Sequence, residues 1–522
     1  MRCLAQQSNL FYACRFFCAT STFLLILFFT SNGVAEIKIS PSLNVSETFT
    51  DNVRLGLIGG GAGGGGFGLG GGFGGSIGAN KTDLITQINP GVAVNGKGQR
   101  YTLNAQYVMN NLIFARNNNL TTIRHMLNAD GNAEIIRDLL FVEGSALINQ
   151  RNIGLLGAQT DSNIFATGNR ATIQVYSVSP YLRYQFQDFA TSEIRYTRSI
   201  VKGGVFGFRD SQRDSFQFGL NSGSSFTKLA WGLNYSNQMI HLNQTGRDIE
   251  LERSIVNVRY LLSNRFSLTS SGGYERNSFL SIRGKTSSPT WTAGFIWSPN
   301  RRTNVQFSAG ERFFGDTYFG EISYNKRLLN LRVLYAEDIT TFNQQAGAFS
   351  AFGALNLNSL GGLGLQDLLG LNNFLTNRVF LQKRFNATVA LNGSRNDISL
   401  NLFTLSRTPY SSGDIDADLI GLNNLILFNN TKQMGGNVAW NYKFSPRTNL
   451  ITTFSYIRFD FSSSNRSNDN LLFSTALNRN FDDDLRGSLE YRRIDRLSGI
   501  QTGGGNISQS ANVVTVSVTK NF

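Results

Sequence analysis

The sequence lacks several features of ordinary secreted or cytoplasmic domains. All three cysteines, Cys3, Cys14 and Cys18, lie near the amino terminus, so the rest of the chain can form neither a disulfide nor a thiolate site. Proline is scarce, with 7 in 522 residues, and histidine occurs only twice. Beyond the amino terminus no apolar run reaches the roughly 20 residues of a spanning helix. We therefore expect this part of the chain to be either water-soluble or a β-barrel.

The amino terminus has the layout of a secretory signal peptide. Arg2 and Arg15 precede a short apolar core at residues 21–29. The small residues Gly33 and Ala35 then mark the expected cleavage after Ala35. A membrane anchor is the competing interpretation, but the core is shorter than a spanning helix requires. We expect residues 1–35 to be a cleaved signal peptide and residues 36–522 to form one exported domain.

Nearly everything after residue 80 alternates between apolar and polar side chains with a period of two, the pattern of half-buried strands. Short turns also alternate with long loops, which is typical of transmembrane barrels with tight periplasmic turns and long extracellular loops. A soluble sandwich shares the residue pattern but need not share the loop pattern. We predict an all-β fold, a transmembrane antiparallel up-and-down β-barrel of about 22 strands (18–24), with its first strand near 37–50 and its last at 509–522.

Two expected loops have unusual compositions. Residues 56–82 are dominated by glycine, whose ordering costs entropy, which favours a disordered external loop over a plug in the barrel. Residues 341–376 are too apolar to lie comfortably in water, and their Leu-rich stretch at 364–371 is a candidate short helix. For this second segment, a constriction inside the lumen and a simple surface loop are equally good interpretations.

If the apolar strand faces meet lipid, the opposite faces line the lumen. Basic residues outnumber acidic ones there, in keeping with a formal net charge of +14, and a basic lumen would favour the passage of anions. Acidic residues in the same phase are Glu193, Glu321 and Glu490, and pairing with them is the alternative role for each cation. The predicted lumen-lining basic residues are Arg183, Arg195, Arg259, Arg312, Arg332, Arg384, Lys443 and Arg492.

The residues of a catalytic or cofactor site are not apparent. The two histidines, His125 and His241, fall in different hairpins without a neighbouring Ser/Asp constellation. The carboxylates at 482–484 fit a solvated turn, and the glycine-rich stretch lacks the Lys-Ser/Thr of a phosphate-binding loop. No cluster of Lys and Arg suits nucleic acid. We expect no enzyme activity, no cofactor or metal, and no nucleic-acid partner.

Two segments near the start of the expected domain resemble the PEP-CTERM system-associated outer-membrane proteins. One holds an E-x-[FY]-[TS]-D-N pattern and the other an I-x-P-G pattern, and the turn at 445–449 resembles turns of porins tied to exopolysaccharide gene clusters. The glycine-rich insert departs from the family pattern. The residues that carry the resemblance are Glu47, Phe49, Thr50, Asp51 and Asn52, then Ile88, Pro90 and Gly91.

The resemblance implies a Gram-negative outer-membrane barrel encoded beside exosortase and exopolysaccharide machinery, in a family without a defined activity. On physical grounds, Asp51 and Asn52 at a strand end are expected to shape the loop through bonds from their side chains to the backbone. A ligand or Ca²⁺ role for Glu47 and Asp51 is the alternative.

The chain ends in an alternating strand in which Val514, Val516 and Val518 precede a terminal aromatic, Phe522. This is the pattern of a carboxy-terminal signal for the barrel-assembly machinery, which is therefore an expected partner together with outer-membrane lipid. A closed barrel has no free edge, so this strand is expected to pair with the first one.

The expected function is a porin-like channel or export conduit in the outer membrane for anionic or polar solute or exopolysaccharide. A non-conducting barrel that anchors surface polymer or exported protein partners is the alternative, and an outer-membrane enzyme is a third possibility. The sequence contains nothing that names the solute or the oligomeric state.

Overall fold

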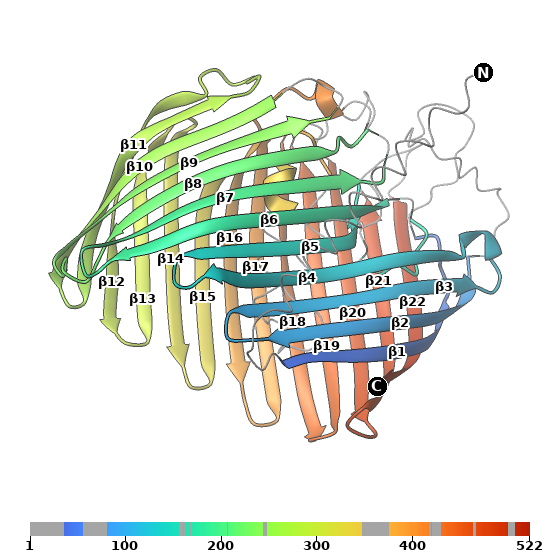
Figure 1. Cartoon of the computed structure of the whole chain (residues 1–522). Coiled ribbons are helices and arrows are strands. Elements are labelled where there is room, and N and C mark those ends of the chain that lie inside the picture. Colours follow the sequence, from blue (N-terminus) through green and yellow to red (C-terminus); the bar gives the residue numbers. More distant parts are fainter. Residues whose placement is uncertain are drawn as a thin grey trace, which may run out of the picture.

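The computed structural model describes residues 36–55, 81–155, 160, 162–167, 169–205, 207–243, 248–346, 375–416, 419, 430–462, 466–498 and 507–522. Most of them belong to one antiparallel sheet of 22 strands (Figure 1). The sheet closes on itself because β1 (Glu36–Thr50) pairs with both β2 (Asp83–Lys97) and β22 (Ile507–Asn521). The predicted 22-stranded antiparallel barrel is thereby confirmed, including the pairing of its first and last strands.

The other strands follow one another around the ring in chain order, each paired with its neighbours. They are β3 (Tyr101–Phe114), β4 (Thr122–Ile136), β5 (Leu140–Asn152), β6 (Arg170–Phe186), β7 (Ala190–Gly203), β8 (Ser211–Ser222), β9 (Leu229–Leu242), β10 (Asp248–Ser263), β11 (Phe266–Ser278), β12 (Ser287–Asn300), β13 (Thr303–Arg312), β14 (Gly315–Lys326), β15 (Leu329–Thr340), β16 (Phe380–Asn392), β17 (Asn396–Pro409), β18 (Thr431–Ser445), β19 (Thr448–Phe461), β20 (Arg466–Asn480) and β21 (Leu485–Ser498).

Connections from even-numbered to odd-numbered strands are short and gather at one end of the barrel, here called the short-turn end, where Phe522 also lies (Figure 1). Connections from odd to even strands gather at the opposite, long-loop end. The shortest of these joins β13 to β14 through Phe313 and Phe314 alone. The β11–β12 loop, residues 279–286, lies beside this short turn. Its Ser281 forms an isolated antiparallel β-bridge with Ser411, which follows β17.

Every second residue along each strand points outward. The barrel exterior is apolar because these outward residues are mainly hydrophobic. Trp291 on β12 and Val516 on β22 are each more than half exposed, as is typical only of a surface that meets lipid. Other exposed apolar side chains of the same phase include Val45, Leu233, Val256, Phe307, Leu402, Val438, Phe454 and Leu489. A belt of this kind on a closed sheet makes the molecule a transmembrane barrel.

Aromatic residues mark both borders of this belt. Trp297, Tyr324, Tyr442 and Phe444 lie outward near the short-turn end, as expected from the sequence. Towards the long-loop end, outward tyrosines donate hydrogen bonds from their hydroxyl groups to polar groups on the same face. The bonded pairs are Tyr196–Asp214, Tyr235–Glu252 (3.1 Å), Tyr335–Glu337, Tyr456–Asp469 (3.0 Å) and Tyr491–Asn512 (2.9 Å).

Several expectations concern residues outside the described ranges. The signal peptide at 1–35, most of the glycine-rich segment at 56–82 and the candidate helix at 364–371 all lie there, so these expectations stay predictions. Among the described residues, none of the helical segments is long and apolar enough to cross a bilayer.

Candidate functional site

The inner face of the barrel is the candidate site, because it is the one concave surface that every strand contributes to. All eight predicted lumen-lining basic residues lie on this face by their strand registers; for example, Arg183 pairs across from Glu193, and Arg195 from Gln217. Towards the short-turn end and the middle of the barrel, their neighbours are mostly Ser, Thr, Asn, Gln and Gly. The register also places Arg259, Arg312, Arg332, Arg384, Lys443 and Arg492 inward.

Most of these cations have acidic partners, so the lumen is less positive than the basic residues alone suggest. Each of six bonds a carboxylate on its own or a nearby strand, whereas Arg259 donates to the Ser267 hydroxyl at 3.1 Å. Among the described residues, neither Arg259 nor Arg384 forms an ion pair. The six pairs include Arg183–Glu193 (2.8 Å), Arg195–Glu193 (3.0 Å), Arg312–Glu275 (2.7 Å), Arg332–Glu321 (2.9 Å), Lys443–Asp397 (2.7 Å) and Arg492–Glu490 (2.8 Å).

Arg195 is firmly held by the residues around it. Its guanidinium bonds both Glu193 and Glu143, and it lies 4.0 Å from the centre of the Tyr181 ring. Bonds to two separate carboxylates combined with stacking suit the planar guanidinium, with its several N–H donors, better than a lysine ammonium. The group is therefore a fixed part of the wall rather than a mobile charge.

Sequence reasoning missed half of this network. The partners Glu143, Glu275, Asp338 and Asp397 face the lumen, but each is identified only through a pairing register between strands. Further inward cations were also missed, namely Arg213, Arg253, Arg407 and Arg496. Extending the alternation of "SFQFGLN" by two residues towards the amino terminus would have found Arg213.

The inner face changes character towards the long-loop end, where it becomes apolar and buried. One cluster joins Ile85, Leu112 and Phe114 to loop residues Val53 and Leu55. A second, around Ile240, Ile249 and Ile339, packs against the Phe313–Phe314 turn. The third and largest comprises Ile153, Leu155, Ala171, Ile173, Val175, Val201, Phe208, Phe342, Ala346, Leu375, Phe403, Leu419, Ile457, Phe459 and Phe461.

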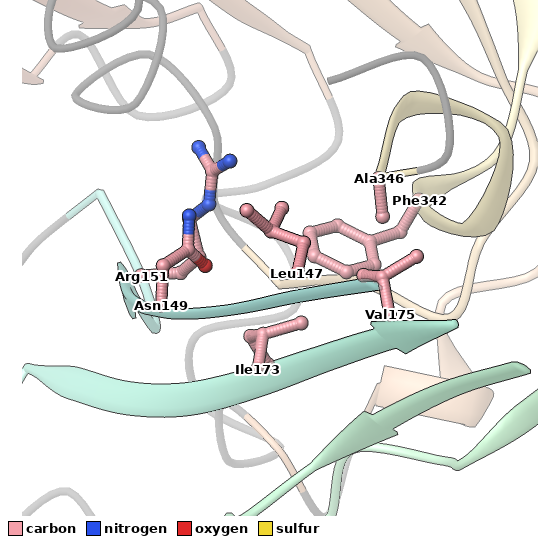
Figure 2. Close-up of a pocket in the computed structure, with 7 residues that line it drawn as sticks. All are labelled: Leu147, Asn149, Arg151, Ile173, Val175, Phe342 and Ala346. Carbon is pink, nitrogen blue, oxygen red and sulfur yellow. The ribbon is translucent and has the colours of Figure 1, made fainter. Parts of the chain in front are cut away.

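Both described ends of the 341–376 segment cross the lumen to the opposite wall. The helical turn at 342–346 follows β15, yet Phe342 packs onto Ile173 and Val175 of β6 (Figure 2), leaving a void of only about 10 Å³. The Asn343 side chain donates to Ser211 at 2.7 Å, and Leu375 N–H donates to the Ile153 carbonyl at 3.1 Å. The mouth is thus narrowed by these ends, while residues 347–374 lie outside the described ranges.

A buried polar node ties the returning end to two other loops. The Asp416 carboxylate accepts hydrogen bonds from the Thr376 hydroxyl at 2.6 Å and from the Asn377 N–H at 2.7 Å. Asn377 in turn accepts from the N–H of Arg209, and Arg378 donates to the Ser411 carbonyl. Burial raises the pKa of Asp416, although its hydrogen bonds oppose that rise.

The residues of the family pattern lie at the seam where the barrel closes. Asp51 accepts from both the N–H and the side-chain amide of Asn512, each at 2.7 Å, and the Asn52 amide donates to the Ser510 carbonyl at 2.9 Å. The Thr50 hydroxyl accepts from the Asn52 N–H. Side chain–backbone bonding was expected here, but the sequence could not show that the partner strand is the last one.

The remaining pattern residues face in different directions. Glu47 and Phe49 point outward, and Glu47 accepts a hydrogen bond from Thr86 at 2.8 Å. Pro90 and Gly91 lie opposite Leu43 and Ser42 on β1. A Cβ on Gly91 would come within 2.9 Å of the Ser42 hydroxyl, so close packing accounts for this glycine.

The terminal strand runs as its alternation indicates. Val514, Val516 and Val518 are exposed on the exterior, and Lys520, which shares their phase, pairs with Asp484 in the β20–β21 turn. The N–H of Phe522 donates to the Pro41 carbonyl at 2.9 Å, and the residue is 70% exposed.

The two histidines lie on the exterior, apart from the lumen network. His125 bonds the Tyr107 hydroxyl at 2.7 Å, and His241 bonds Asp248 at 2.8 Å. Within the described residues, no three His, Cys, Asp or Glu side chains are grouped as a metal site would require.

No family model and no curated protein matches the chain. Solved structures similar to it include the siderophore receptor PirA from Pseudomonas aeruginosa, at 9% identity and a TM-score of 0.45, covering 93% of this chain and 80% of that one. The ferric enterobactin receptor PfeA, also from Pseudomonas aeruginosa, has 8% identity, a TM-score of 0.48 and the same coverage. OccAB4 from Acinetobacter baumannii has 10% identity and a TM-score of 0.32, covering 93% and 98%. No functional conclusion follows from likenesses of this strength.

Proposed function

We propose that the protein is a porin-like channel or export conduit in the outer membrane of a Gram-negative bacterium. The observation that carries this proposal is the contrast between its two faces, with an apolar belt outside and, over the middle and the short-turn end, a polar, charge-paired wall inside. A wall of this kind offers hydrogen bonds and compensated charges to hydrated solutes. The cargo is an anionic or polar solute or an exopolysaccharide.

The crossing ends of the 341–376 segment supply the gate in this proposal. They narrow the long-loop mouth and are held by Phe342, Asn343 and the Asp416 node. The long-loop end faces the exterior of the cell and the short-turn end faces the periplasm, the orientation usual for barrels with such loops. Passage then depends on how far the loop ends move.

The cellular setting belongs to the same proposal. The pattern at Glu47–Asn52 supports a place among the PEP-CTERM system-associated barrels and a link to exopolysaccharide export. The exposed ring of Phe522 supports recognition by the barrel-assembly machinery after removal of residues 1–35. Enzymatic activity is not part of the proposal, because both histidines lie on outward-facing strand positions, His125 beside Tyr107 and His241 beside Asp248, away from the lumen.

A non-conducting anchoring barrel is the second candidate. The three apolar clusters at the long-loop end favour it, because they bury side chains where an open pore would be wetted. Surface polymer or an exported protein would then be held at the loops rather than passed.

Conductance in planar bilayers separates the two candidates. The purified barrel is compared with a variant in which residues 347–374 are replaced by a short Gly-Ser linker. A channel gives discrete current steps that grow in the variant. Absence of steps from both proteins contradicts the conduit and supports the anchor.

A further inference from the structure

We propose that the inner wall over β7–β10 carries a saccharide-binding hollow, a stopping point for sugar units in the lumen. This inference rests on the proposed function, because the hollow is reached only by solutes that enter the barrel. The four strands are neighbours in the ring and form one continuous stretch of wall (Figure 1).

The registers of these strands arrange the lining residues in three rows across the wall. The row nearest the loops is Arg195–Gln217–Ser236–Arg253, and the next is Glu193–Gly219–Asn234–Ile255. The third holds Asn221, Gly232 and Asn257. The hollow that they enclose has a volume of about 520 Å³, within the range of small-molecule sites.

Gly219 makes this wall concave. A Cβ there would meet only the Asn234 amide oxygen at 3.5 Å and the Asn221 amide nitrogen at 3.9 Å, both ordinary contacts, so the missing side chain leaves the space open. Gly232 is overlaid by the Asn221 side chain, since a Cβ there would lie 2.7 Å from the Asn221 oxygen. A flat ring can therefore approach the backbone between the rows.

Four of the polar side chains that line the hollow are amides, those of Gln217, Asn221, Asn234 and Asn257. Among the described residues, Asn234 and Asn257 have no side-chain hydrogen-bond partner. Each amide presents a donor and an acceptor side by side. That arrangement matches adjacent hydroxyl groups on a sugar ring, where each hydroxyl can both donate and accept.

The charges at the rim are already compensated, which favours a neutral polyhydroxyl ligand over a bare anion. Arg195 is held by Glu193 and Glu143, and Arg253 pairs with Glu275 at 3.1 Å. A guanidinium engaged in this way still has N–H groups for a hydroxyl acceptor. An anion would have to compete with the carboxylates for the same donors.

Binding is tested on the full barrel in detergent by isothermal titration with three neutral pentasaccharides, those of maltose, cellulose and mannan type. Gly219→Val fills the hollow, and Asn234→Leu removes one amide. The control is Asn330→Leu, an inward amide on β15. We expect wild type and control to bind at least one sugar equally. Asn234→Leu should bind about tenfold more weakly, the effect of one lost hydrogen bond, and Gly219→Val at least that much more weakly because its side chain occupies the hollow.

Absence of binding of all three sugars to the wild type, or equal binding by the hollow variants, overturns the inference. A folded state is checked by heat-modifiable gel mobility, so that a weak variant is not simply unfolded. The two proposals fail separately. Sugar binding without conductance removes the conduit and keeps the hollow, whereas conductance without sugar binding removes the hollow and keeps the conduit.

Discussion

Asp51 and Asn512 lie 461 positions apart in the chain, yet the Asp51 carboxylate accepts two hydrogen bonds from Asn512, each 2.7 Å long. The pair lies at the long-loop end of the seam between β1 and β22. Below it, Thr48 bonds Thr515 at 3.1 Å and Asn44 bonds Thr519 at 2.8 Å on the inner face. Side chains thus reinforce the one strand pairing that joins the two ends of the sheet.

Replacing Asp51 with Ala is expected to weaken closure of the barrel. Two hydrogen bonds to a half-buried carboxylate are lost, which should lower the free energy of unfolding by about 1–3 kcal/mol. Urea unfolding followed by tryptophan fluorescence measures the change. The control is Asp483→Ala in the exposed β20–β21 turn, where about 0.5 kcal/mol or less is expected; equal effects at both positions would remove the special role of the seam.

The Asp416 node should become less stable as the pH rises. Burial raises the pKa of Asp416 in the folded state, so its contribution is complete below the unfolded pKa of about 4 and is lost as the pH rises through the folded value. Hydrogen exchange of residues 375–379, corrected for intrinsic rates, should show less protection at pH 8 than at pH 4.

Asp416→Asn is the matched variant, because it keeps an acceptor for the Asn377 N–H and removes the titrating group. Its protection at 375–379 should not change between pH 4 and pH 8. A wild-type node that grows more protected as the pH rises would contradict the direction of the shift.

Phe342 should hold the start of the 341–376 segment against the far wall. It is 6% exposed and meets Phe208 edge to face, with ring centres 5.2 Å apart. Phe342→Ala removes a contact of about 3–5 kcal/mol from the cluster and should let this loop end detach. In bilayers we expect larger or noisier current steps, while Leu328→Ala in an exposed short turn leaves them unchanged. Identical traces for the two variants would mean that Phe342 does not control the mouth.

Ion selectivity should depend on Arg259 and Arg384, the two of the eight predicted lumen-lining cations that form no ion pair within the described residues. Replacing Arg259 and Arg384 together by Gln is expected to lower the anion-to-cation permeability ratio roughly twofold, because uncompensated charge sets the local ion concentration. The reversal potential in a KCl gradient measures this ratio. The control removes the Arg332–Glu321 pair as two glutamines, which leaves the net charge unchanged; an equal shift there would show that pairing does not matter.

The sequence predicted the parts of the fold that depend on local pattern. Alternation along "NVAWNYKF" places Trp440 and Tyr442 outward, and the spacing of turns yields the strand number. It could not predict the Glu143–Arg195 pair, because those residues meet through the register of β5 on β6 and of β6 on β7. The contact of Phe342 with β6 could not be predicted from the sequence either, because the path of a loop depends on the tertiary surface against which it packs.

Uptake by proteoliposomes tests the central claim, passage of polar solute through the lumen, most directly. Liposomes that contain the purified barrel are diluted into isotonic sugars of increasing size, and swelling is followed by light scattering. The conduit proposal predicts swelling that falls with solute size and rises when 347–374 is replaced by the linker. Liposomes that stay as unswollen as protein-free ones, with either protein and the smallest sugar, would contradict it.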